Sequence, residues 1–250
     1  SRKVLFTQSG MLLVDQARTV LREVKLLKEM ASNQGKEMTG PLHIGLIPTV
    51  GPYLLPYIVP TLKETFPDLE VFLYEAQTHQ LLEQLETGRL DCAIVARVPE
   101  TEAFIEVPIF DEKMLLAVSD QHPWASESKI AMNTLKGQEM LMLDDGHCLR
   151  NQALDYCFTA GAKEDSHFQA TSLETLRNMV AANAGITFMP ELAVLNEGTR
   201  AGVKYIPCHS PEPSRTIALV YRPGSPLRNR YERVANAISE QVKSILANKK

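Results

Sequence analysis

The sequence lacks several features that would assign it to a specialised class. No run approaches the ~20 uncharged apolar residues of a membrane helix, so we expect no association with membranes. The first residues do not follow the basic, apolar and small-residue pattern of a secretion leader, which predicts a cytoplasmic protein. No internal repeat, Walker loop or dinucleotide fingerprint is present. With 250 residues, 44% apolar and 22% charged, the composition is that of ordinary globular domains.

The charge balance argues against DNA binding by most of the chain. The net charge is −4, but residues 1–40 carry seven Lys or Arg against four Asp or Glu. Because affinity for DNA rests on neutralising phosphates, the chain taken whole is expected to be a poor nucleic-acid binder. The opening residues SRKVLF are typical of the end of a basic strand, so we expect another module upstream.

Cysteine is scarce, and its four positions do not suggest a structural disulfide framework. Reducing compartments keep thiols free, and the exceptions are mostly catalytic or redox-sensing. Cys92 and Cys208 lie in apolar runs typical of strands, where we expect inert core thiols. Cys148 and Cys157 lie close together in sequence and need a separate explanation.

Cys148 follows His147 in the sequence DGHCLR, and Cys157 comes nine positions later. If the intervening segment is helical, the two sulfurs lie on opposite sides of the helix, roughly 13 Å apart along its axis. A disulfide requires Cα atoms within about 7 Å, so bond formation would require the helix to unfold. Closing so short a loop is entropically inexpensive. The spacing predicts a redox-driven refolding.

The thiol of Cys148 has three possible roles. His147 and Arg150 could supply positive charge that favours the reactive thiolate, and Gly146 would let backbone amides approach. Alternatively, Cys148 is simply a small buried apolar residue. The third possibility is a zinc site, although no tight C-x₂₋₄-C pair is present. Its ligands would be His147, Cys148, Cys157 and His167.

A long helix is predicted from a cap at Thr7 or Ser9 to residues 33–35. Its apolar residues follow the 4-3 spacing of a coiled-coil seam, which favours packing against a partner helix, and hence dimerisation, over packing on its own domain. These residues are Leu13, Ala17, Val20, Val24, Leu27 and Ala31.

After Gly40, short apolar runs alternate with helical patterns, which is typical of parallel βαβ units in an α/β fold. Strands are predicted at 42–47, 69–76, 90–95, 114–119, 139–143, 167–171, 186–189, 203–206 and 216–221. Helices are predicted at 53–66, 79–85, 148–158, 173–183 and 227–246. Thr49 and Thr78 lie where strands lead into helices, so each is either a helix cap or a ligand contact.

Several motifs resemble those of LysR-type transcription regulators. The opening SRKVLFTQSG is similar to the family's wing and linker start, residues 88–91 (GRLD) to its G-x-L-D strand, and residues 171–190 to its helix, turn, strand and proline. The GHCLR motif with Cys157 resembles peroxide-sensing members. Asn151 stands where many relatives have aspartate. Asn183 stands where glycine is usual, and asparagine tolerates the left-handed backbone of such a turn.

The resemblance implies two α/β subdomains similar to periplasmic binding proteins, preceded by a long linker helix for dimerisation. The wing end and linker helix would span 1–36. Subdomain I would comprise 41–111 and 217–250, and subdomain II, carrying the redox cysteines, 112–216. The chain would cross between them near Asp111 and Thr216.

The resemblance further implies a hydrogen-peroxide-sensing transcription regulator rather than an enzyme, without metal or cofactor. Cys148 would react with peroxide and Cys157 would resolve the product, in a pocket formed by Thr49, Thr78, His147 and Arg215. Implied partners are a homodimer or homotetramer, DNA through an N-terminal domain, RNA polymerase, and glutaredoxin or thioredoxin as reductant. Alternatives are a regulator that binds a small organic effector between the subdomains, a periplasmic solute-binding protein, and a thiol peroxidase.

Overall fold

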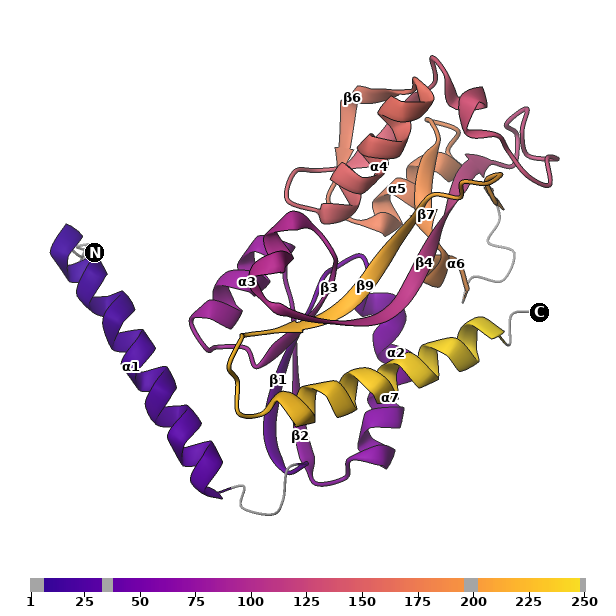
Figure 1. Cartoon of the computed structure of the whole chain (residues 1–250). Helices are drawn as coiled ribbons and strands as arrows, with labels where there is room; N and C mark the ends of the chain where they lie inside the picture. Colours follow the sequence, from indigo (N-terminus) through magenta and orange to yellow (C-terminus); the bar gives the residue numbers. More distant parts are fainter. Residues whose placement is uncertain (1–6, 33–37, 196–201, 248–250) are drawn as a thin grey trace.

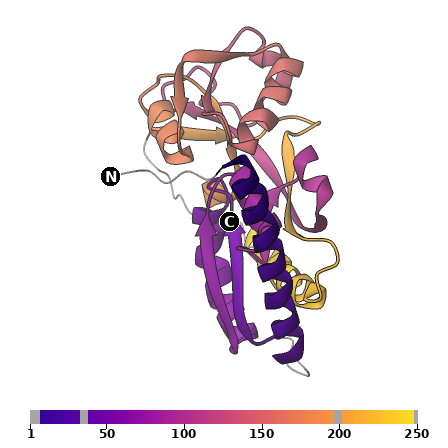
Figure 2. The same cartoon turned by 90° about the vertical axis from the view of Figure 1, so that its left-hand side faces the viewer.

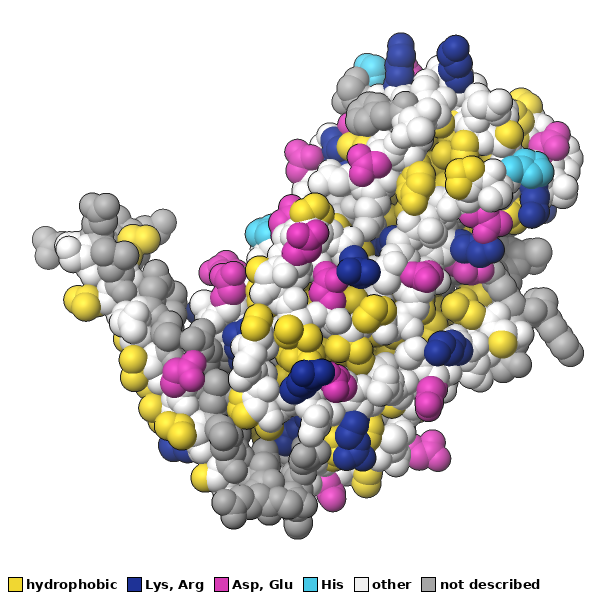
Figure 3. Space-filling view, in the orientation of Figure 1, with side chains coloured by type: hydrophobic (Ala, Val, Ile, Leu, Met, Phe, Trp, Pro, Cys, Tyr) yellow, Lys and Arg dark blue, Asp and Glu magenta, His cyan; other side chains and the backbone are white. Residues whose placement is uncertain are grey.

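The computed structural model describes residues 7–32, 38–195 and 202–247. It begins with one long helix, α1 (Gln8–Ser32), whose first turn is capped by Thr7, the side chain of which accepts the Gly10 amide. The predicted seam stays exposed, with Leu13 71% and Leu27 65% accessible. Figures 1 and 2 show α1 as a separate rod beside the body, and Figure 3 shows its apolar side chains at the surface. This exposed stripe is what a partner helix would cover.

The body begins with parallel βαβ units, as the sequence pattern predicted. β1 (Gly40–Leu46), β2 (Leu69–Glu75) and β3 (Cys92–Ala96) are parallel and connected by α2 (Gly51–Thr65) and α3 (Thr78–Glu86). The 3₁₀ helix η1 (Pro99–Ala103) then leads out of this sheet. The carboxyl ends of the parallel strands, and the helix starts that follow them, therefore share one edge.

Two long strands extend this sheet toward the other half of the molecule. β4 (Ile105–Ser119) and β9 (Ser214–Tyr221) pair antiparallel, and the sheet order is β2-β1-β3-β9-β4-β7. The prediction of 114–119 covers only the second half of β4. The first half contains Pro108 and a register shift between Pro108 and Phe110, features that weaken a strand signal.

The other half contains a second group of strands and helices (Figure 1). Its elements are η2 (Met132–Leu135), β5 (Glu139–Leu143), α4 (Cys148–Ala160), β6 (Lys163–Ala170), α5 (Leu173–Ala181), β7 (Thr187–Pro190), α6 (Glu191–Leu195) and β8 (Val203–Ile206). The last helix, α7 (Arg228–Ala247), returns to pack on α2. The predicted helices over 148–158, 173–183 and 227–246 are confirmed.

The α/β body contains two hydrophobic cores. The first core gathers apolar side chains from β1, β3, β9, α2, α3 and α7, and the second from β5, β7, α4, α5 and the end of β4. β4 and β9 run between them, close to the crossings expected near Asp111 and Thr216. The exact subdomain boundaries remain a prediction. Asn183 has φ +58°, so the left-handed turn expected there is present.

None of the helices described is both long and apolar enough to cross a bilayer.

Candidate functional site

Cys148 is the first residue of α4 and lines a cavity of about 160 Å³. Thr78, at the start of α3, and His147 line the same cavity, and η1 contributes part of the wall. The structure therefore brings together three of the residues predicted from the sequence. Cys148 itself is 8% exposed, so its sulfur is enclosed but meets a space large enough for a small molecule.

Gly146 allows the chain before Cys148 to lie against α3. Its φ is +94°, and a Cβ atom at this position would collide with the side chain of Gln77. The side-chain amide nitrogen of Gln77, Nε2, donates to the backbone carbonyl oxygen of Asp145 at 3.4 Å. Only glycine fits both the left-handed backbone and the close approach.

Thr78 does not act as a helix cap. The backbone amide of Gln77, which precedes α3, donates to the Gln80 side chain instead. The Thr78 hydroxyl is buried and has no hydrogen-bond partner within the described ranges. An unpaired buried hydroxyl is costly, and at the cavity wall it is free to bond a molecule held in the cavity.

Thr49 and Arg215 belong to a second buried cluster, the hinge network, which also includes Glu112. Arg215 donates to the Thr49 hydroxyl oxygen at 2.9 Å and to the Thr49 carbonyl oxygen at 3.1 Å. It also forms an ion pair with Glu112 at 2.7 Å, and Glu112 accepts the Leu192 amide at 3.0 Å. Neither Thr49 nor Arg215 is among the described residues that line the Cys148 cavity. The predicted pocket is thus split between the cavity and the hinge network.

Two side chains next to Cys148 in sequence, His147 and Arg150, lie near carboxylates. His147 Nε2 lies 3.2 Å from Asp144 Oδ1. Arg150 bonds Glu164 at 2.7 Å and lies 3.3 Å from Asp145. The idea that Arg150 supplies positive charge to the thiol stays a prediction, and the two carboxylates beside the guanidinium offset part of that charge. The backbone amides at the start of α4 remain as the donors nearest Cys148 along the chain.

Helix α4 presents its two cysteines to different parts of the protein. Cys148 packs with the first core, whereas Leu149, Ala153 and Cys157 pack in the second. Cys157 is fully buried, and its sulfur lies 3.0 Å from the Met140 sulfur. Because both cysteines belong to one continuous helix, the predicted separation of roughly 13 Å along the axis applies.

Burial raises the pKa of Cys157 to about 12. At a pH between the two pKa values, Cys157 therefore stays protonated in the folded protein but is deprotonated in the unfolded chain, where its pKa is near 9.0. Stability from this group is complete below the unfolded pKa and is lost as pH rises from there toward the folded pKa.

We expect the free energy of unfolding of the reduced protein to fall by about 1 kcal/mol more than in Cys157→Ala between pH 8 and pH 10. Urea unfolding of both proteins at the two pH values, under a phosphine reductant, measures this difference. Equal losses would show that Cys157 is not the titrating group.

The other two thiols are core residues. Cys92 and Cys208 are buried, and burial raises the pKa of each, to about 11 for Cys208. The part of the chain that the structure describes contains no group of three or more His, Cys, Asp or Glu side chains able to hold a metal. The four candidate zinc ligands are not brought together.

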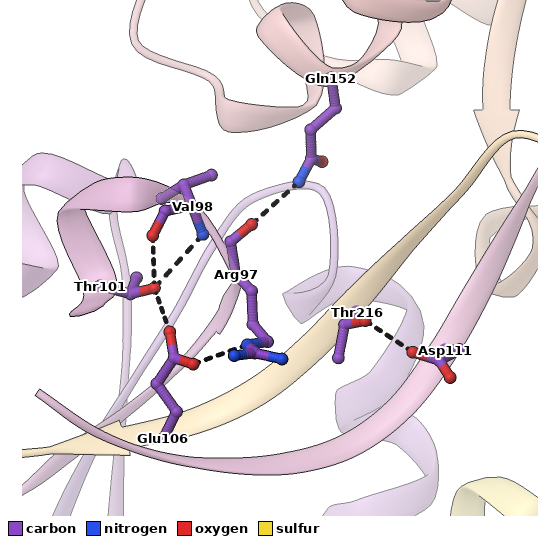
Figure 4. A network of polar contacts seen from close by, with 7 residues as sticks. All are labelled: Arg97, Val98, Thr101, Glu106, Asp111, Gln152 and Thr216. Atoms are coloured by element: carbon purple, nitrogen blue, oxygen red, sulfur yellow. Dashed lines mark hydrogen bonds and ion pairs between the residues drawn. The ribbon is translucent and has the colours of Figure 1, made fainter.

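Figure 4 shows a polar network that joins α4 to the first sheet. The Gln152 amide nitrogen donates to the Arg97 carbonyl oxygen at 3.4 Å, and Arg97 pairs with Glu106 at 2.6 Å. Glu106 in turn accepts the Thr101 hydroxyl, so the network fixes the η1 segment that lines the cavity. Sequence reasoning missed Gln152, although its spacing of four residues from Cys148 indicates the same helix face.

A second cavity, of about 500 Å³, shares His147 with the Cys148 cavity. Residues of both halves line it, including Tyr53 from α2 and Glu174 from α5, whose side chains hydrogen-bond at 3.1 Å. His147 is thus part of the wall of both cavities.

Comparison with known proteins agrees with this architecture. Residues 35–243 match the profile of the LysR substrate binding domain, so the fold is that of a LysR-type regulatory region. The chain is 92% identical over 246 residues to a hydrogen peroxide-inducible genes activator of Haemophilus influenzae, covering 98% of this chain and 82% of that protein. It is 70% identical over 238 residues to the DNA-binding transcriptional dual regulator OxyR of Escherichia coli K12, covering 95% and 78%.

Solved structures give the same result. The structure superposes on the crystal structure of the oxidized form of OxyR with a TM-score of 0.77. The two sequences are 64% identical, and the match covers 83% of this chain and 98% of that one. A cysteine mutant of Corynebacterium glutamicum OxyR in its H₂O₂-bound form has a TM-score of 0.80 and 33% identity, covering 99% and 79%. The chain belongs to the LysR family and, within it, to the OxyR regulators.

Proposed function

We propose that this chain senses hydrogen peroxide through Cys148 and Cys157 and converts their oxidation into a change of shape. The observation that carries the proposal is the Cys148 cavity, where an enclosed sulfur, the unpaired Thr78 hydroxyl and His147 line one small space. The H₂O₂-bound relative supports peroxide as the ligand.

In the first step the Cys148 thiolate attacks one peroxide oxygen and the O–O bond breaks, giving a sulfenic acid and hydroxide, which takes up a proton to become water. Amides at the start of α4 favour negative charge on the sulfur. The Thr78 hydroxyl and His147 orient the peroxide and stabilise the departing oxygen. Thr49 and Arg215 support the cavity from the hinge network, where the Arg215 ion pair with Glu112 fixes the guanidinium.

In the second step the Cys157 sulfur attacks the Cys148 sulfenic acid, a disulfide forms, and water leaves. Cys148 is the first residue of α4 and Cys157 lies nine residues further along the same helix. The helix must therefore unfold for the two sulfurs to meet. Cys157 must leave the second core, and Cys148 must leave the first. The rearrangement would reorient the subunits of a homodimer or homotetramer held by α1, and with them the DNA-binding domains and their contacts with RNA polymerase. Glutaredoxin or thioredoxin would reset the protein.

Replacing Thr78 with valine tests the cavity directly. Because the hydroxyl has no partner within the described ranges, its loss should leave the free energy of unfolding unchanged or slightly higher. The rate of Cys148 oxidation should fall by about tenfold, as expected for one lost hydrogen bond to the reacting peroxide. Stopped-flow peroxide kinetics and urea unfolding measure the two effects. Thr61→Val, on α2, is the matched control, and equal rates in all three proteins would remove Thr78 from the site.

Titration with peroxide tests the proposed function. One equivalent added to the reduced protein should give one Cys148–Cys157 disulfide, identified by peptide mass spectrometry. A dominant bond to Cys92 or Cys208, or no disulfide at all, would contradict the proposal.

The second cavity supports one alternative, a small organic effector bound between the two halves. Its hallmark would be thermal stabilisation by a metabolite in a protein whose thiols do not respond to stoichiometric peroxide.

A further inference from the structure

Tyr156, the residue before Cys157, fastens α4 to the start of β9. Its hydroxyl donates to the Ser214 carbonyl oxygen at 2.9 Å and accepts the Ser214 amide at 3.2 Å. Ser214 is the first residue of β9 and is followed by Arg215 of the hinge network. One hydroxyl thus satisfies both backbone groups of a residue next to that network.

The position of Tyr156 in α4 explains how it reaches β9. Cys148, Gln152 and Tyr156 are spaced by four residues and lie on one stripe of the helix. Cys148 packs with the first core and Gln152 reaches Arg97, so this stripe faces the first sheet. The neighbouring stripe, Leu149, Ala153 and Cys157, packs in the second core.

We propose that the Tyr156 hydroxyl is a latch that holds the start of β9 in the reduced protein and is released when the disulfide forms. The inference rests on the proposed Cys148–Cys157 disulfide. To close that bond, Cα atoms roughly 13 Å apart along the helix must come within about 7 Å. Tyr156 is one peptide unit, about 3.8 Å, from Cys157. We infer that Cys157 takes part in this movement, and Tyr156 cannot keep both bonds to Ser214 when its neighbour is displaced.

Release of the latch links the cysteines to the hinge strands. Ser214 pairs with Lys113 of β4, and the next pair in the ladder is Arg215 with Glu112. Freeing Ser214 therefore loosens the strand end beside the buried ion pair that connects Thr49 with α6. Oxidation at α4 thereby reaches the strands that join the two cores.

The latch stabilises only the reduced form, so removing the hydroxyl should favour oxidation. For the exchange of the reduced protein with oxidised glutathione, which yields the protein disulfide and two reduced glutathione molecules, we expect Tyr156→Phe to raise the equilibrium constant about fivefold. A fivefold change corresponds to a reduction potential about 20 mV more negative. Tyr74→Phe is the control, because it loses a hydroxyl bond to His43 on β1, away from α4.

Glutathione redox buffers with mass-spectrometric quantification of the disulfide measure this constant in the three proteins. Amide hydrogen exchange at Ser214 is the second readout: the amide should be protected in the reduced protein and exposed in reduced Tyr156→Phe and in the oxidised protein. Equal equilibrium constants in Tyr156→Phe and the unsubstituted protein would overturn the latch while leaving the proposed sensor intact. Failure of the unsubstituted protein to form the Cys148–Cys157 bond would overturn both.

Discussion

Cys148→Ser is expected to lose the peroxide response completely. The reaction depends on a thiolate, and serine at the start of α4 supplies no comparable nucleophile, so the rate of peroxide consumption should fall by roughly two orders of magnitude or more. The fold should be retained, because serine is nearly the same size as cysteine and residue 148 itself lines the cavity. Peroxide consumption, followed in stopped flow, measures the effect.

Two cysteine variants complete this test. Cys208→Ala removes a buried thiol of the second core and should react with peroxide like the unsubstituted protein. Cys157→Ala should still consume one equivalent but accumulate sulfenic acid, which dimedone traps, because no resolving sulfur is present. Undiminished consumption by Cys148→Ser would assign the reaction to another residue.

Arg215→Met is expected to lower the free energy of unfolding by about 3 kcal/mol or more. The Arg215 side chain is fully buried, and the side chain of its partner Glu112 is only 1% exposed. The substitution therefore leaves a buried carboxylate without its cation. The Thr49 carbonyl oxygen and hydroxyl lose their donor as well. Urea unfolding of the reduced protein measures the loss.

A double variant separates charge from packing. Adding Glu112→Gln to Arg215→Met removes the unpaired charge, while the glutamine carbonyl oxygen can still accept the Leu192 amide. We expect at least half of the lost stability to return. Losses that simply add in the double variant would contradict a buried ion pair.

The sequence predicted the local features of the site, but not how its residues divide between the Cys148 cavity and the hinge network. The residue pattern predicted the helix over 148–158, and the nine-residue spacing then gave the separation of the sulfurs, because helical geometry depends only on neighbours along the chain. Thr78 and His147 were predicted together and lie at one cavity. Thr49 and Arg215 were predicted in the same pocket, but Glu112 draws Arg215 into the hinge network.

The remaining features depend on contacts between distant segments. Nothing in the sequence pairs Tyr156 with Ser214, or Arg150 with Glu164, because their meeting requires the packed arrangement of α4, β6 and β9. The first half of β4 was missed because Pro108 interrupts its pattern, while pairing with β9 holds it in the sheet. Tertiary contacts decided each of these cases.

Amide hydrogen exchange across α4, before and after one equivalent of peroxide, tests the central claim most directly. In the reduced protein the amides of the helix should be protected from its second turn onward. With the Cys148–Cys157 bond confirmed by mass spectrometry, protection between these residues should be lost, while α2 and α7 keep theirs. A disulfide between the two cysteines in a protein whose α4 amides stay protected would contradict the account.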